Sequence, residues 1–314
     1  MDVSTSSPIN MTTFLPSSNT TNVTTTSTTT DAISTTNKPL SQSSHRIALI
    51  IIYTVVLVTG TVGLVIMIRV LKTNLRSWTT IAFLNLLLAH VIFLLTVPFR
   101  IHYYVTNHWS LSTLTCKIVS AMIHLHMYVV FVIYVAILVT RFVQYYKKTD
   151  RMEFYRRLHA LAASVGIWSI LIIVGPIILS KYGTKKPEEN KCFNFGQQAI
   201  EGSVFGFNIF LSVVIILVSC ILGVIVGIIL YSLIKKHGAA CRNQQEFWAQ
   251  MRNINLIIII FICLVPYHLF RFYYLTHTQD MEESNEVFLS ITTLTCTDML
   301  LIFTKMGIFQ VCGF

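Results

Sequence analysis

Long apolar runs, separated by short polar segments, dominate this chain. Seven of them can be read, at residues 47–71, 78–103, 114–145, 158–180, 203–234, 255–275 and 287–303. A helix needs about 20 such residues to cross a bilayer. Backbone groups inside lipid must be paired within the segment, and no run alternates with the period of a barrel strand. The pattern therefore predicts an all-α fold, a bundle of seven transmembrane helices.

Composition supports a membrane environment. The chain is 54% hydrophobic and only 11% charged, whereas soluble domains carry about 25% charged residues. The net charge of +10 would suit nucleic acid, but the basic residues lie between apolar runs rather than on one soluble face. We therefore expect membrane lipids as surroundings and no nucleic-acid partner.

The N-terminal segment has a different character. Residues 1–45 are rich in Ser and Thr and lack apolar periodicity, which predicts disorder. Asn-x-Ser/Thr acceptors at Asn10, Asn19 and Asn22 predict glycosylation of this tail. No signal peptide precedes the first apolar run, so that run would direct insertion. We expect an extracellular tail at 1–45, a transmembrane domain at 46–306 and a short cytoplasmic tail at 307–314.

Charge distribution predicts the orientation. With the N-terminus outside, the cytoplasmic segments hold 14 basic and 3 acidic residues, and the outer segments hold 9 of each. This bias is typical of the positive-inside rule and predicts an extracellular N-terminus on a multi-pass plasma-membrane protein. Cys116 and Cys192 then lie together in the oxidising compartment, so we predict that they form a disulfide.

Several short motifs occur in a characteristic order and spacing. They are Asn85-Leu86-Leu87, Thr96-Val97-Pro98-Phe99-Arg100, Trp109 with Cys116, Arg141, Trp168, Tyr231-Ser232-Leu233-Ile234 and Cys263-Leu264-Val265-Pro266-Tyr267-His268. Together they resemble the rhodopsin-like (class A) G-protein-coupled receptors, in the purinergic and lipid-mediator branch, over nearly all of residues 46–306. The resemblance implies an extracellular ligand, a heterotrimeric G protein as partner, and no cofactor. It also implies that Arg141 and Tyr231 serve G-protein coupling.

The chain departs from this family at its switch positions. Thr140 replaces the acid that normally restrains the arginine at 141, and Phe142 replaces the tyrosine that follows. Because that restraint would be missing, we hypothesise raised basal signalling. The alternative is that Arg141 only reaches the cytoplasmic headgroups with its charged end.

Basic and aromatic residues cluster near the expected outer ends of the helices. Spacings of three and four place those of the third run on one helix face. The expected ligand contacts are Arg100, Lys117, His124, Tyr128, Tyr267, His268, Arg271 and Tyr274. An arginine fork suits carboxylate or phosphate, so we expect an anionic, partly apolar ligand, with a nucleotide disfavoured by Glu282, Glu283 and Glu286. Alternatively, Arg100 and Arg271 only anchor their helices at the interface.

A polar centre is expected deeper in the bundle. His90 and Asp298 occupy positions that neighbour one another in the family, with His126 close by, where most members hold sodium. A histidine lowers the negative charge available to a hard cation, so we expect weak or absent sodium binding. A structural His–Asp hydrogen bond, a proton-sensitive switch and a transition-metal site all remain open. The first is favoured because buried charges are normally paired, and the predicted sites include no metal.

Other classes of protein fit less well. The chain has no Gly-rich phosphate loop, no His-Glu-x-x-His run and no nucleophile elbow, so we expect no enzyme. The altered switch positions leave a second candidate, a receptor-shaped decoy or heteromer partner that does not signal. A transporter or channel is less expected because the runs show no twofold internal similarity.

Overall fold

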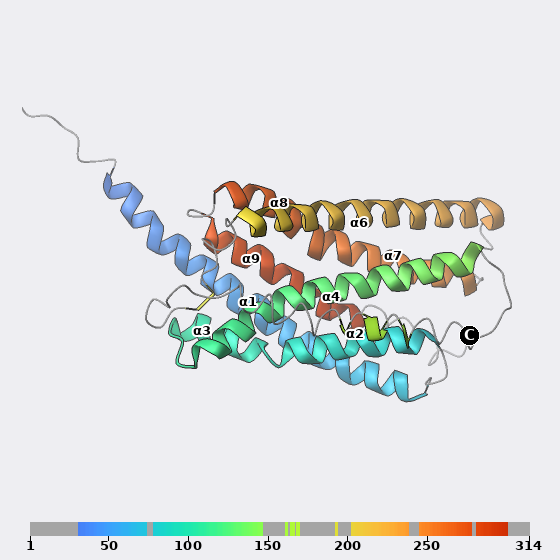
Figure 1. The fold of residues 1–314 in the computed structure, drawn as a ribbon, viewed down its shortest axis with the longest axis horizontal. Helices are drawn as coiled ribbons and strands as arrows, with labels where there is room; N and C mark the ends of the chain where they lie inside the picture. Colours follow the sequence, from blue (N-terminus) through green and yellow to red (C-terminus); the bar gives the residue numbers. More distant parts are fainter. Residues whose placement is uncertain are drawn as a thin grey trace, which may run out of the picture. The chain divides into compact units, whose positions relative to one another are not determined.

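The protein is described here by a computed structural model, which defines residues 31–73, 78–146, 161–162, 164–166, 168–169, 192–193, 202–238, 245–277 and 281–300. Every regular element in these ranges is helical (Figure 1), which confirms the all-α prediction. Five helical stretches within them are long and apolar enough to cross a membrane. They are Ser43–Arg69, Thr80–Thr106, Thr113–Val143, Phe205–Lys236 and Gln250–Thr276. The predicted run at 158–180 lies largely outside the described residues, although the parts of it that are defined are helical.

The first helix is longer than predicted. α1 spans Asp31–Thr73 and so includes residues 31–45, for which the sequence analysis expects disorder. Extending an existing helix costs far less than nucleating one, and the apolar run from residue 47 supplies the nucleus. Residues 1–30, with Asn10, Asn19 and Asn22, lie outside the described residues.

The second span is interrupted. α2 (Trp78–Leu94) ends in a turn at Leu95 and Thr96, and α3 (Val97–Thr106) continues the span. Pro98 lies in the first turn of α3, where its missing N–H costs least. α3 ends at Asn107, whose left-handed backbone (φ 54°) donates its N–H to the Tyr103 carbonyl oxygen at 2.7 Å.

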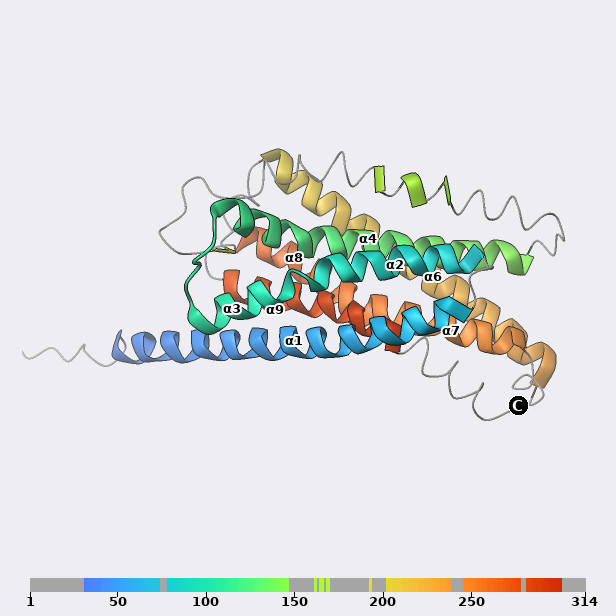
Figure 2. The ribbon, with the colours of Figure 1, turned by 90° about the horizontal axis from the view of Figure 1, so that it is seen from below.

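α4 (Thr113–Tyr146) is the central helix of the bundle. In its most apolar window 61% of residues are buried, compared with 28% in α1 and in α6 (Gly202–His237). α2 lies beside α4 in both views (Figures 1 and 2), and α6 packs along the sixth span. Asn85 of α2 accepts hydrogen bonds at its Oδ1 from Ser164 Oγ (2.7 Å) and Trp168 Nε1 (2.9 Å), so it also holds the defined part of the fourth span.

The last two spans change helix type at mid-depth. The sixth comprises α7 (Gln245–Ile259), the π-helical η3 (Ile260–Leu264) and α8 (Val265–Thr276). Pro266 follows η3 and removes a backbone donor, and a π turn accommodates such a break. The seventh begins with α9 (Glu282–Thr292), tightens into the 3₁₀ segment η4 (Thr293–Thr297), and is helical again to residue 300.

Threonine side chains explain the tightening at η4. Thr292, Thr293 and Thr295 are completely buried, and each hydroxyl donates to the carbonyl oxygen three residues earlier at 2.6–2.9 Å. These local bonds satisfy the hydroxyls without water. The turn also directs Cys296 and Asp298 into the bundle, where both side chains are buried.

Glycines on α1 permit its close approach to the seventh span. A Cβ atom at Gly63 would lie 3.1 Å from Met299 Cβ, and one at Gly60 would lie 3.4 Å from Cys296 Cβ. The distance at Gly63 is shorter than an ordinary van der Waals contact, so a larger residue there would force α1 away from the seventh span.

We predict that Gly63→Leu destabilises the protein by about 1–3 kcal/mol, the usual cost of overpacking. Gly227→Leu on α6 is the matched control, because no atom lies within 4 Å of a Cβ built there. The thermal unfolding of both variants in detergent would be compared with that of the native chain. Equal melting temperatures for the two variants would contradict the close packing of α1.

Candidate functional site

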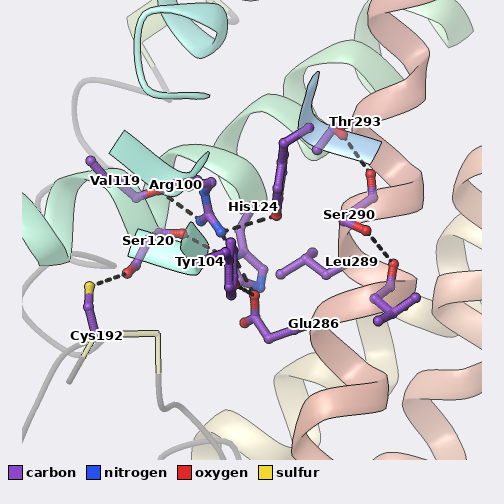
Figure 3. Close-up of polar contacts among 12 residues, drawn as sticks. Arg100, Tyr104, Val119, Ser120, His124, Cys192, Glu286, Leu289, Ser290 and Thr293 are labelled. Atoms are coloured by element: carbon purple, nitrogen blue, oxygen red, sulfur yellow. Dashed lines mark hydrogen bonds and ion pairs between the residues drawn. The ribbon is translucent and has the colours of Figure 1, made fainter. Parts of the chain in front are cut away.

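Arg100 is the most buried charge in the part of the bundle that carries the Cys116–Cys192 disulfide, which we call the disulfide end. Its exposed fraction is 0%. The guanidinium donates to the Tyr53 hydroxyl (3.3 Å) and the Val119 carbonyl oxygen (3.0 Å), and lies 3.8 Å from Glu286 Oε2. The Phe193 ring lies 4.4 Å from its central carbon. Arg100 thus joins α1, α3, α4 and α9 (Figure 3).

Glu286 completes this network. Its carboxylate accepts a hydrogen bond from the Tyr104 hydroxyl at 2.8 Å (Figure 3). The Tyr104 ring stacks on the Tyr53 ring with 5.9 Å between the ring centroids. A buried guanidinium is tolerated only when a counter-charge and further acceptors surround it. From the sequence alone, Glu286 is expected only as an acid that disfavours a nucleotide. Its role as the partner of Arg100 joins residues that are far apart in the chain.

The predicted disulfide between Cys116 and Cys192 is present, with the two Cα atoms 6.0 Å apart. It places the following residue, Phe193, against Arg100, in a left-handed backbone conformation with φ 71°. Phe193 also packs edge-on against Trp109 at 5.7 Å. The disulfide therefore supplies one wall of the Arg100 environment.

A cleft of about 250 Å³ opens beside this network. The residues that line it are His45, Arg46, Leu49, Tyr103, Tyr104, Asn107, Cys192, Phe193, Glu282, Glu283 and Glu286. Three carboxylates face one arginine and one histidine, so the cleft is acidic. None of the eight predicted ligand contacts lines it, although Arg100 lies directly behind it through its pair with Glu286.

Arg271 of α8 forms a second buried cationic centre. Its guanidinium donates to the side-chain oxygens of Asn285 (3.2 Å) and Asn208 (3.4 Å). The rings of Tyr274 and Tyr267 lie 5.1 Å and 5.9 Å from its central carbon. The structure thus brings together three of the predicted ligand contacts and adds two asparagines from α6 and α9.

The remaining predicted contacts lie between α4 and α8. His268 Nδ1 is 3.1 Å from Ser212 Oγ of α6, and its ring lies 6.4 Å from that of Tyr128. His124 Nδ1 approaches the Ser120 carbonyl oxygen at 3.4 Å. Lys117 is half-buried on the same helix, about two turns before His124. Tyr128 and His268 therefore meet across α4 and α8.

The polar centre forms between α2, α4 and the seventh span. His90 Nε2 lies 3.3 Å from Asp298 Oδ1, and His90 Nδ1 lies 2.8 Å from His126 Nε2. Tyr134 donates its hydroxyl hydrogen to Asp298 Oδ2 at 2.5 Å. The expected neighbours are thus assembled, and Cys296 joins them, which the sequence analysis does not foresee. Two imidazoles, a thiol and one carboxylate do not fit sodium, which prefers oxygen ligands.

Arg141 marks the opposite end of α4. Its Nε atom is buried without a hydrogen-bond partner, and the neighbouring Thr140 hydroxyl bonds instead to the Ala136 carbonyl oxygen at 2.5 Å. The nearby charge is that of Arg252 on α7, whose own Nε atom is likewise buried and unbonded. Among the side chains that the structure defines, no carboxylate forms an ion pair with Arg141. Tyr231 of α6 is 67% exposed on the surface of the bundle.

Comparison with known proteins gives a consistent picture. Residues 62–300 match the model of the 7 transmembrane receptor (rhodopsin family). The chain is 41% identical to human "Probable G-protein coupled receptor 141" over 263 residues, 81% of this chain and 86% of that protein. It is 25% identical to "Probable G-protein coupled receptor 34" of Pan troglodytes, over 85% of this chain and 75% of the relative. Identity to mouse "2-oxoglutarate receptor 1" is 24%, over 70% and 66% of the two chains.

We predict that Glu286→Gln lowers the free energy of unfolding by about 3–5 kcal/mol, because it leaves the buried Arg100 charge uncompensated. Glu283→Gln is the control, since that carboxylate is exposed and its ion-pair partner among the described side chains is His45 at 3.1 Å. Its loss should cost less than about 1 kcal/mol. Equilibrium unfolding in detergent would measure the free energy of unfolding of both variants. Equal losses would contradict a stabilising role of the Arg100–Glu286 pair.

Proposed function

Because the chain belongs to the rhodopsin family of seven-transmembrane receptors, we propose that it transmits an extracellular signal to heterotrimeric G proteins and has raised basal output. The chain is a multi-pass membrane receptor and not an enzyme. The observation that carries the proposal is that Arg141 forms no ion pair with a carboxylate among the described side chains and has the charge of Arg252 nearby.

The two arginines favour separation of α4 and α7 at the Arg141 end. Like charges repel most strongly where water is excluded, and both Nε atoms are buried. Thr140 carries no charge, and its hydroxyl donates a hydrogen bond to the Ala136 carbonyl oxygen of its own helix. The packed arrangement of α4 and α7 at this end therefore lacks an ionic restraint among the described side chains. A smaller free-energy gap then separates this closed arrangement from an open one, in which the two helices move apart.

The orientation follows from charge and redox chemistry. The disulfide end faces the extracellular side because disulfides persist in oxidising compartments. The Arg141 end then faces the cytoplasm, with the excess of basic residues there. This orientation puts the N-terminus outside and leaves Arg141 to face the G protein.

The ligand is an anion with substantial apolar surface. Arg100 is committed to Glu286, whereas Arg271 is held by amide oxygens that an incoming carboxylate or phosphate could replace. The 2-oxoglutarate named for the mouse relative is a dicarboxylate, which supports an acidic ligand here. The acidic cleft would repel a highly charged anion. A lipid acid or a peptide carboxylate therefore fits better than a nucleotide.

A receptor-shaped decoy is the second candidate, supported by the altered switch residues Thr140, Phe142 and His90. A panel of G-protein activation assays on the native chain, without added ligand, separates the two. Output above the vector control for at least one G protein supports a signalling receptor. Background output for every G protein, at matched surface expression, favours the decoy.

We predict that Arg252→Glu lowers basal G-protein activation about fivefold, because a carboxylate on α7 would pair with Arg141 and stabilise the closed end by about 1 kcal/mol. Thr140→Asp should act in the same direction. Lys236→Glu is the control for charge alone, since that residue is exposed on α6. An equal decrease with Lys236→Glu would contradict a specific contact with Arg141.

We predict that Arg271→Gln weakens the potency of an acidic agonist about 10–100-fold, the worth of a hydrogen bond to a charged group. The agonist would come from a screen of fatty acids, lysophospholipids and peptides with free C-termini. His277→Gln, an exposed basic position just beyond α8, is the control. Unchanged potency in Arg271→Gln at normal surface expression would place the anion elsewhere.

A further inference from the structure

Three metal-ligating side chains meet in the middle of the bundle. They are His90 of α2, His126 of α4 and Cys296 of η4, with exposed fractions of 1%, 3% and 1%. One donor atom from each lies within 4.8 Å of the other two. The separations are 2.8 Å between His90 Nδ1 and His126 Nε2, and 3.4 Å and 3.6 Å from Cys296 Sγ to these nitrogens.

These separations are close to those of ligands around one tetrahedral metal. With metal–nitrogen bonds of about 2.0–2.1 Å and metal–sulfur bonds of about 2.3 Å, bound donors lie about 3.3 Å (N to N) and about 3.6 Å (N to S) apart. Both sulfur distances already agree with this geometry. Only the two imidazoles need to separate, by about half an ångström, which small side-chain rotations allow.

The surrounding groups prepare the nitrogens for coordination. The other ring nitrogen of His90, Nε2, faces Asp298 Oδ1 at 3.3 Å, so its proton is drawn to that side and Nδ1 is left to bind. Tyr134 in turn fixes the second carboxylate oxygen. A carboxylate behind a ligating histidine is the usual support of such sites.

The negative charge of the site favours a divalent metal ion. A thiolate at Cys296 and the carboxylate of Asp298 together carry two negative charges, which a dication balances in a fully buried site. Imidazole and thiolate suit zinc and not sodium, calcium or magnesium. We propose that His90, His126 and Cys296 bind one zinc ion, with Asp298 as the positioning residue and a fourth position open to water.

The competing arrangement needs no metal. In it a charged His90 donates one proton to His126 Nε2 and turns the other toward Asp298. In that arrangement Cys296 contributes only weak hydrogen bonds to the two rings, which a serine hydroxyl can replace, whereas zinc requires its sulfur. Replacing the sulfur therefore distinguishes the zinc site from the metal-free arrangement.

The test uses the full-length receptor in lipid nanodiscs, stripped with a chelator and then titrated with Zn²⁺ or Co²⁺. The native chain is expected to bind one equivalent of Zn²⁺ by mass spectrometry and to show a thiolate-to-cobalt charge-transfer band with Co²⁺. Cys296→Ser should abolish that band and the stoichiometric zinc. Cys220→Ser, which removes an exposed cysteine on α6, should retain both.

Asp298→Asn tests the supporting carboxylate. It should weaken zinc affinity about 10–100-fold while one equivalent still binds at saturation. X-ray absorption of the zinc-loaded native chain should show one sulfur and two imidazole nitrogens, and this measurement requires no variant to fold. Absence of stoichiometric zinc in the native chain, equal binding by Cys296→Ser, or preferential binding of Cu⁺ would each overturn the proposal.

A consequence for signalling rests on the proposed function. Zinc would tie α2, α4 and the seventh span together at mid-depth and should lower basal output of the native chain but not of Cys296→Ser. Binding without an effect on output would leave the site intact and contradict only its regulatory role. Absence of basal output, with normal binding, would count against the proposed function alone.

Discussion

A guanidinium withdrawn completely from water is the constraint on which the disulfide end depends. Arg100 is stable there only because Glu286, Tyr53, a carbonyl oxygen of α4 and the ring of Phe193 converge on it. Those partners come from three other helices and from the segment fixed by the disulfide. Losing any of them leaves a charge or polar group buried without compensation. The positions of α1, α3, α4 and α9 at this end are therefore interdependent.

The need to compensate buried charges is met to different degrees along α4. At the disulfide end Arg100 faces the Glu286 carboxylate at 3.8 Å, and at mid-depth His90 lies 3.3 Å from Asp298 and 2.8 Å from His126. At the far end, within the part of the chain that the structure describes, Arg141 has no carboxylate partner and has the charge of Arg252 nearby. Electrostatic cohesion between the helices thus decreases from one end to the other. Under the proposed function the Arg141 end must open, and this end carries the weakest ionic restraint among the described side chains.

Much of the fold could be predicted from local pattern, since lipid exposes apolar side chains and forbids unpaired backbone. The interruptions at Pro98 and Pro266 could not be placed, because the sequence shows the missing donor but not the π or turn geometry that absorbs it. In the sites, Arg100 and Asp298 stand out as rare intramembrane charges. Glu286 and Cys296 do not, because the residues that they contact, Tyr104 and His90, lie 182 and 206 residues away in the chain. Only tertiary packing creates those pairs.

Both polar centres depend on the seventh span, and this links them. Glu286 lies on α9 and Cys296 on η4, and the buried threonines between them convert the helix from the α to the 3₁₀ form. A 3₁₀ segment rises about 2.0 Å per residue instead of 1.5 Å, so a return to α geometry would shift one centre relative to the other. The disulfide end and the middle of the bundle thus depend on one short segment of the seventh span, which carries Glu286 and Cys296.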